Sequence, residues 1–136
     1  MSATEMLDRL ERLTNAHDLD ALVDCFATDY VNETPVHSDR GFRGRDQVRR
    51  NWTQIFAAVP DLKARVLASI ADDVRVWSEW EMSGTRRDGV QHLMRGVIIF
   101  SVADGRASTA RFYLEPVDVC TDDVNAAVRD TLGATS

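Results

Sequence analysis

Hydrophobic residues in the first part of the chain recur every three or four positions, which is the spacing of one helix face. Ser2 and Glu5 have the spacing of a capping box, which predicts a first helix after Ser2. Asp18 can cap a short second helix. The apolar positions of the two helices are Met6, Leu7, Leu10, Leu13, Leu19, Leu22, Val23 and Phe26. The chain is therefore predicted to begin with a helical hairpin.

The next segment changes its period and then returns to a helix. Residues 29–36 have the pattern of a strand closed by Pro35, and the polar, glycine-containing residues 37–44 predict a loop. A third helix is predicted over residues 45–58, because Pro60 prevents its continuation. Its apolar positions share one side and are Val48, Trp52, Ile55, Phe56 and Val59.

The second half of the chain alternates apolar and polar positions, as strands do. Four long strands, separated by turn signals, are predicted over residues 62–70, 74–84, 90–102 and 106–117. Thr121 can cap a short C-terminal helix that carries Val124, Val128 and Leu132 and ends at Gly133. Helices followed by a curved antiparallel meander predict an α+β fold. The length of 136 residues predicts one domain, residues 1–136.

Two of the predicted strands carry polar side chains on one face. In the last strand Arg111, Tyr113 and Glu115 share a face, because successive side chains of a strand point to opposite sides. In the strand over residues 74–84, one face carries Trp77, Glu79 and Glu81. Such a face is either ordinary solvent-exposed surface or the mixed wall of a pocket, and the alternation alone leaves both open.

Composition and charge exclude several functions. The formal net charge is −6 and the pI is near 5, which disfavours nucleic acid because phosphate binding needs a basic patch. No apolar run has the length of a membrane span, and we expect a cytoplasmic protein. Cys25 and Cys120 lie far apart without metal-ligand spacing, so reduced, packed thiols are expected. The histidines, His17, His37 and His92, are scattered and predict no metal site.

Several fragments, in their order along the chain, resemble the nuclear-transport-factor-2-like superfamily, particularly its SnoaL-like (polyketide cyclase-like) branch. The matching fragments cover residues 17–22, 26–31, 42–46, 56–62, 84–85 and 104–106. The resemblance implies a cone-shaped fold, in which three N-terminal helices pack into a strongly curved, antiparallel or mixed sheet, followed by a short C-terminal helix. It also implies a pocket open at one end and a homodimer paired through the outer sheet face.

The resemblance turns one face of each strand inward and selects the pocket interpretation for Arg111, Tyr113 and Glu115. It suggests that Trp52 and Phe56 close the pocket, although plain packing of the helix on the sheet is an equal alternative. The further residues expected to contact a ligand are Trp77, Met94, Glu33 and His37. His37 lies in the loop where a pocket mouth is expected, and histidine is a common acid–base group.

Related enzymes give expectations at single positions. Glu115 falls where SnoaL-like cyclases place a general acid–base Asp. The last strand is also similar to the Arg-x-Tyr-x-Asp pattern of limonene epoxide hydrolases, whose Arg/Asp pair corresponds to Glu79 and Glu81 and whose water-holding Tyr and Asn correspond to Val31 and Glu33. Epoxide hydrolysis would therefore need a rearranged site.

The mechanism of ketosteroid isomerase is not expected, because its general base and its oxyanion-hole acid correspond to Thr34 and Ile98.

Two carboxylates converging on an arginine in a pocket separate into an acid and a base, because the pKa of one rises while the pKa of the other falls. Glu79, Glu81 and Glu115 around Arg111, with Tyr113 as a hydrogen-bond donor, would suit a cofactor-free cyclase or isomerase.

Two non-catalytic functions remain open. The charges could simply pair with one another in a pocket that binds a small apolar metabolite, because buried charges must be paired to exist. The domain could also serve only for dimerisation.

Overall fold

The computed structural model describes residues 2–119 and 122–133 of the chain. Its elements are, in order, α1 (Ala3–Ala16), α2 (Leu19–Asp24), β1 (Phe26–Glu33), the short 3-10 helix η1 (Ser38–Arg40), β2 (Phe42–Arg43), α3 (Arg45–Ala58), β3 (Lys63–Ala71), β4 (Arg75–Thr85), β5 (Gln91–Ala103), β6 (Arg106–Pro116) and α4 (Val124–Leu132). Within the described residues no helix is long and apolar enough to cross a lipid bilayer.

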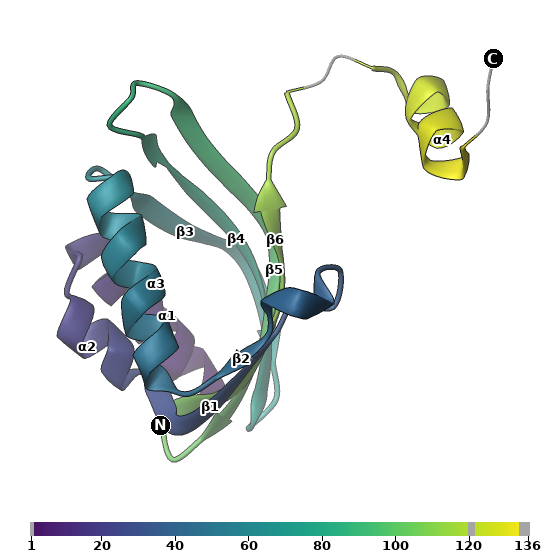
Figure 1. Cartoon of the computed structure of the whole chain (residues 1–136). Coiled ribbons are helices and arrows are strands. Elements are labelled where there is room, and N and C mark those ends of the chain that lie inside the picture. Colours follow the sequence, from purple (N-terminus) through teal and green to yellow (C-terminus); the bar gives the residue numbers. More distant parts are fainter. Residues whose placement is uncertain (1, 120–121, 134–136) are drawn as a thin grey trace.

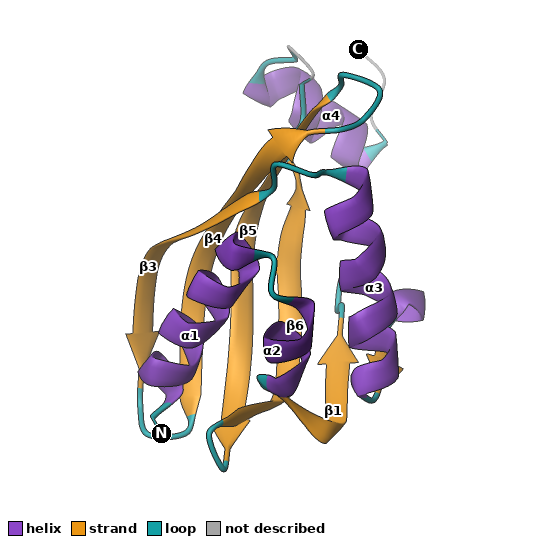
Figure 2. Ribbon diagram, turned by 90° about the vertical axis from the view of Figure 1, so that its left-hand side faces the viewer, coloured by secondary structure: helices purple, strands orange, loops and turns teal. Residues whose placement is uncertain are grey.

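The six strands form one curved sheet with the order β2-β1-β6-β5-β4-β3. Neighbouring strands are antiparallel except β1 and β6, which run parallel. Helices α1, α2 and α3 cover the concave side of this sheet, whereas α4 stands apart from it beyond the end of β6 (Figures 1 and 2). The predicted α+β cone is confirmed.

Side-chain caps set the limits of the two N-terminal helices. The Ser2 hydroxyl accepts a hydrogen bond from the Glu5 amide at 3.1 Å, and the Asp18 carboxylate accepts one from the Ala21 amide at 3.2 Å. Both side chains satisfy an amide that the helix itself leaves unpaired. Helix α1 ends at Ala16, and the capping residue His17 adopts the left-handed conformation with a φ of 54°. The predicted helical hairpin is therefore present.

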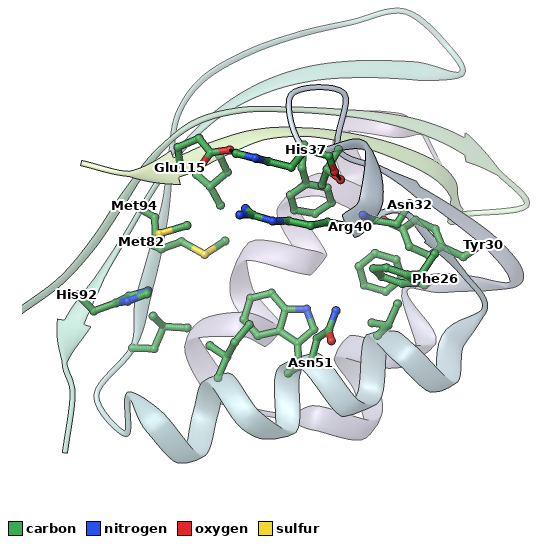
Figure 3. A pocket seen from close by; sticks show the side chains of 18 residues that line it. Phe26, Tyr30, Asn32, His37, Arg40, Asn51, Met82, His92, Met94 and Glu115 are labelled. Carbon is green, nitrogen blue, oxygen red and sulfur yellow. Dashed lines mark hydrogen bonds and ion pairs between the residues drawn. The ribbon is translucent and has the colours of Figure 1, made fainter. Parts of the chain in front are cut away.

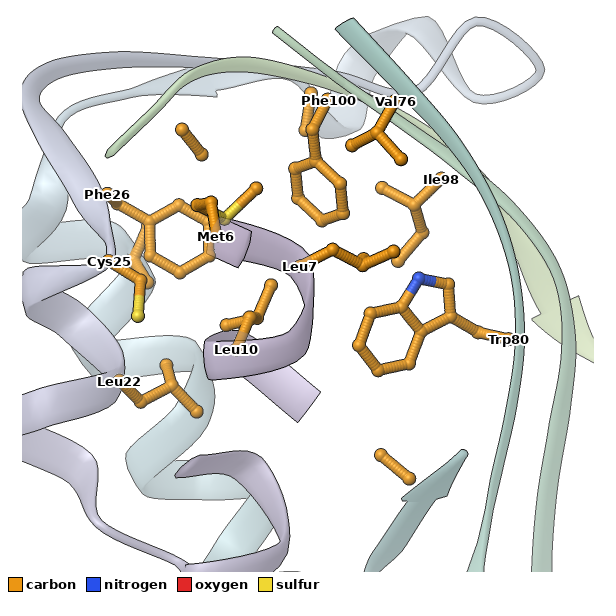
Figure 4. Packing of buried hydrophobic residues seen from close by; sticks show 14 of the residues in the cluster. Met6, Leu7, Leu10, Leu22, Cys25, Phe26, Val76, Trp80, Ile98 and Phe100 are labelled. Atoms are coloured by element: carbon orange, nitrogen blue, oxygen red, sulfur yellow. The ribbon is translucent and has the colours of Figure 1, made fainter. Parts of the chain in front are cut away.

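The core lies between α1 and the concave face of β4, β5 and β6. Leu7 and Leu10 of α1 are buried there together with Trp80, Ile98 and Phe100 of the sheet (Figure 4). Burial of each such side chain contributes about 1.5–3 kcal/mol. This core fills one end of the cone and leaves the other end, beneath α3, less densely filled.

Gly96 lies in the middle of β5, opposite Trp80 of β4 and Leu114 of β6. Its φ of 151° is one that residues with a side chain rarely adopt. A Cβ at this position would collide with the backbone oxygen of Tyr113. A glycine thus lets β5 and β6 approach each other closely at this position.

Local structure differs from the sequence prediction at two places. Strand β1 begins at Phe26, three residues before the predicted start, because Phe26 pairs with Ala107 of the distant strand β6. Residues 37–44, predicted as a loop, include η1 and the short strand β2, whose Phe42 pairs with Asn32. Thr121 lies outside the described residues, and the side chain that caps α4 is that of Asp123.

Candidate functional site

A pocket of about 390 Å³ opens at the end of the cone that the core leaves free. Its inner wall comes from the strands, with Tyr30 of β1, Met82 of β4, Met94 of β5 and Leu114 of β6. Trp52 of α3 lies on the opposite side of the pocket. In Figure 3, Glu115, His37 and Arg40 lie together on one side of the pocket, and Asn51 lies on the other. The size suits a small organic molecule and the walls are mostly apolar.

The apolar face of β6 points into the cone, so the predicted direction of its polar face is wrong. Phe112 and Leu114 line the pocket, whereas Arg111 and Tyr113 lie on the outer face of the sheet. The Arg111 side chain is 58% exposed, and its Nε donates to Glu33 Oε2 at 3.1 Å. The concave face is covered by helices, so burial of apolar side chains determines which face turns inward.

The polar face of β4 also lies outside. Trp77 is 52% exposed, and Glu79 is exposed beside it. Glu81 forms ion pairs with Arg65 at 3.2 Å and with Arg95 at 2.8 Å across the outer face. The expected convergence of Glu79 and Glu81 on Arg111 inside a pocket is therefore wrong.

The inward-facing residues of β4 belong to the core, and the polar atoms of Ser78 and Trp80 among them are hydrogen-bonded. The indole of Trp80 donates to the Ser78 hydroxyl at 2.9 Å, which donates to the backbone oxygen of Ile98 at 2.6 Å. Ser78, Trp80 and Met82 bring no carboxylate and no guanidinium to the interior. The strand therefore lacks, on its inner face, the Arg/Asp pair of the hydrolase pattern.

On β1, Phe26, Tyr30 and Asn32 line the pocket, and Glu33, contrary to expectation, does not line it. The hydrolase resemblance placed its Tyr and Asn at Val31 and Glu33. Tyr30 and Asn32 each lie one residue before these positions. The Tyr30 hydroxyl donates to Asn32 Oδ1 at 2.7 Å. Burial raises the pKa of the Tyr30 phenol, so this group is a neutral hydrogen-bonding group at physiological pH.

Four of the expected site residues do lie at the pocket: Glu115, His37, Trp52 and Met94. Phe56 does not line it. Its ring stacks on the His17 imidazole with centroids 4.4 Å apart. Phe56 of α3 thus packs against the C-terminal end of α1.

The mouth of the pocket holds an imidazole–carboxylate pair. His37 Nε2 lies 2.8 Å from Glu115 Oε1, and the two side chains are 34% and 42% exposed. His37 belongs to a tight turn, in which its amide donates to the Thr34 backbone oxygen at 2.8 Å and its own backbone oxygen accepts from the Thr34 hydroxyl at 2.7 Å. The ring therefore extends from a fixed backbone.

Glu115 and Arg111 start from the same, outer face of β6, yet the Glu115 side chain reaches the pocket on the inner side. The pairing of β1 with β6 ends at Glu33 and Arg111, so β1 does not cover the last residues of β6. The Glu115 side chain can then turn over this uncovered edge toward His37 (Figure 3). The position of a strand end, and not the alternation of faces, places this carboxylate.

Three further polar residues line the pocket, and the sequence did not single them out for it: Arg40, Asn51 and His92. Arg40 follows His37 in η1, and its guanidinium points into the pocket (Figure 3). It forms no ion pair with any residue that the structure describes. Asn51 accepts a hydrogen bond from Gln47 at 2.8 Å. In residues 2–119 and 122–133, no group of three His, Cys, Asp or Glu is arranged to hold a metal ion.

Comparison with models of protein families shows to which family the chain belongs. The model of the SnoaL-like domain matches residues 7–110, from α1 to the middle of β6. The chain belongs to the SnoaL-like domain family. The resemblance to nuclear-transport-factor-2-like proteins is thereby confirmed. A search of curated proteins found no match.

Solved structures share the fold of this SnoaL-like domain. RV0760c from Mycobacterium tuberculosis in complex with estradiol-17beta-hemisuccinate is 20% identical, with a TM-score of 0.72 over 83% of this chain and 94% of that one. An LEH-like epoxide hydrolase of M. tuberculosis is 18% identical, with a TM-score of 0.69 over 82% and 80%. SalBIII, an epoxide hydrolase/cyclase-like enzyme of pyran ring formation in salinomycin, is 20% identical, with a TM-score of 0.71 over 84% and 89%.

Proposed function

We propose that this SnoaL-like domain binds a small, largely apolar metabolite in the pocket beneath α3. The observation that carries the proposal is a cavity of about 390 Å³ whose walls are mostly apolar and whose charged groups lie at the mouth. Such a site accepts an apolar body and orients it by a few polar contacts. The complex of RV0760c with a steroid ester supports the proposal, because a similar fold accommodates a ligand of this kind.

Binding is tested with two tryptophan variants of neighbouring residues. Met94 lines the pocket and Leu93 points to the opposite face of β5. The neutral fluorescent probe N-phenyl-1-naphthylamine is titrated into the wild type, Met94→Trp and Leu93→Trp. We expect Met94→Trp to fill the cavity and weaken binding at least about tenfold, and Leu93→Trp to bind as the wild type does. Equal binding by both variants would refute the pocket as the binding site.

We further propose cofactor-free general acid–base chemistry at the His37–Glu115 pair. His37 Nε2 lies 2.8 Å from the Glu115 carboxylate and, in a neutral imidazole, carries the ring N–H, because two acceptors would repel each other. Nδ1 of His37 is then the lone-pair nitrogen and can take a proton from a bound carbonyl compound. A cyclase or isomerase reaction needs such a step.

The alternatives are distinguished by particular residues. If the pocket catalyses no reaction, the domain is a pure binding protein, and the Glu115 carboxylate only orients the ligand. Epoxide hydrolysis is less well supported, because Trp80 and Met82 occupy the inner face of β4. The supporting observation that remains for it is the pair of Tyr30 and Asn32 at 2.7 Å.

We propose that the domain forms a homodimer through the outer face of the sheet. Large apolar side chains lie exposed on this face, with Ile70 at 76%, Trp77 at 52% and Tyr113 at 37%. Exposed apolar area of this kind commonly marks a protein interface.

For location we propose the cytoplasm, which agrees with the free, buried thiol of Cys25.

A further inference from the structure

The two charged side chains that line the pocket differ in their partners. Among the residues that line it, Glu115 is the carboxylate and Arg40 is the guanidinium. The Glu115 carboxylate is bound by His37 at 2.8 Å, whereas Arg40 forms no ion pair with a described residue. Its backbone is held, because the Arg40 amide donates to the His37 backbone oxygen at 2.9 Å. Arg40 therefore brings to the cavity a cation that no described residue pairs, whereas the Glu115 carboxylate already has a partner.

Arg40 differs in this respect from Arg111 and Arg45. Arg111 pairs with Glu33 on the outer face, and Arg45 donates to the Phe26 backbone oxygen at 2.8 Å. The guanidinium of Arg40 instead extends over the apolar wall of the pocket (Figure 3). It presents a planar fork of N–H donors, a shape that matches a carboxylate.

The net charge of −6 does not oppose this arrangement. Charges on distant surfaces are screened within about 8–10 Å at physiological ionic strength, so nearby groups dominate the field at the mouth. His92, which also lines the pocket, adds no negative charge. Arg40 is therefore the lining cation that can still pair with the anionic group of a ligand.

We propose that the ligands of this pocket are amphipathic carboxylic acids, with the carboxylate bound by Arg40 and the apolar body lying against Met82 and Met94. A single guanidinium suits the single negative charge of a carboxylate. This inference rests on the proposed binding function of the same pocket and specifies the chemical class of its ligand.

The test uses two probes that differ only in the head group, sodium octanoate and octan-1-ol. Protein labelled with methyl-13C methionine is titrated with each probe and followed by NMR. Met82 and Met94 report on the pocket, and Met6 in the buried core is the internal reference. We expect both probes to shift the signals of Met82 and Met94 and to leave that of Met6 in place, and octanoate to bind about tenfold more tightly.

The matched variants are Arg40→Gln and Arg43→Gln. Arg43 lies three residues away, is exposed and does not line the pocket, so its substitution removes the same charge from the same neighbourhood. We expect Arg40→Gln to lower the octanoate affinity to that of octan-1-ol while the alcohol affinity stays the same. Arg43→Gln should keep the tenfold preference.

Four results would overturn the inference. Equal affinities of the wild type for the two probes, or an octanoate affinity that Arg40→Gln leaves unchanged, would refute the role of Arg40 and leave the binding function standing. An equal loss in both arginine variants would show a general charge effect and refute it too. If neither probe shifts the signals of Met82 and Met94, the proposed binding function fails as well.

Discussion

At the scale of single residues, His37 and Glu115 decide what the pocket can do chemically. They come from a turn after β1 and from the end of β6, and they meet at 2.8 Å at the mouth. The carboxylate orients the imidazole, so removal of either side chain should affect proton transfer. Glu33, a glutamate on the outer face paired with Arg111, provides a matched control.

Proton transfer is measured on a small apolar ketone, 2-tetralone, by proton NMR of its α-hydrogen exchange in D2O. We expect the wild type to accelerate the exchange, and Glu115→Gln and His37→Gln to lower this acceleration about 10²-fold, the scale of positioned acid–base catalysis. Glu33→Gln should behave as the wild type does. No acceleration by the wild type, or equal acceleration by Glu115→Gln, would leave the domain as a binding protein.

The sequence could place some of these residues and not others, for a physical reason. Alternation shows which residues of a strand share a face, and Arg111 and Tyr113 do share one. It does not show which face the helices cover, and burial of Phe112 and Leu114 turned the polar residues outward. Arg40 lies in a segment without periodicity, so no local signal pointed to it.

At the scale of elements, the long strand β5 shapes the open end of the cone. The periodic pattern predicted this strand closely, but the three-residue shift at the start of β1 depends on pairing with β6, a contact distant in sequence. Gly96 is the residue in β5 where the approach of β6 leaves no room for a side chain. Local pattern alone gives no sign of this approach.

Gly96→Ala is compared with Gly89→Ala. Both glycines have positive φ, of 151° and 86°, but an added Cβ at Gly89 would have open space while one at Gly96 would meet the Tyr113 backbone. We expect Gly89→Ala to cost about 1–2 kcal/mol of unfolding free energy and Gly96→Ala clearly more, about 3 kcal/mol or above. Urea denaturation measures both. Equal losses would show that β6 does not constrain the position.

At the scale of the whole molecule, the two faces of the sheet have separate roles in this account. The concave face holds the core and the pocket, and the convex face carries Trp77 and Ile70 exposed to solvent. The family resemblance predicted both a pocket and a pairing surface. The residues that the sequence assigned to the pocket wall on β4 belong instead to the proposed pairing surface.

The homodimer is tested with Trp77→Glu, because an unpaired charge within an apolar interface is strongly unfavourable. We expect a dimeric wild type and at least about 100-fold weaker association of the variant, measured by analytical ultracentrifugation. Val90→Glu, at an exposed apolar residue in the turn between β4 and β5, should remain dimeric. A monomeric wild type would contradict the proposal, as would a Trp77→Glu variant that stays fully dimeric.

The central claim is that the pocket beneath α3, and not the outer sheet face, is the ligand site. Its most direct test is a crystal structure of the protein with N-phenyl-1-naphthylamine. The account predicts electron density for the probe between Trp52 of α3 and Met82 and Met94 of the sheet, with the His37–Glu115 pair at its edge. Density on the outer face beside Trp77, with the pocket beneath α3 empty of probe, would contradict it.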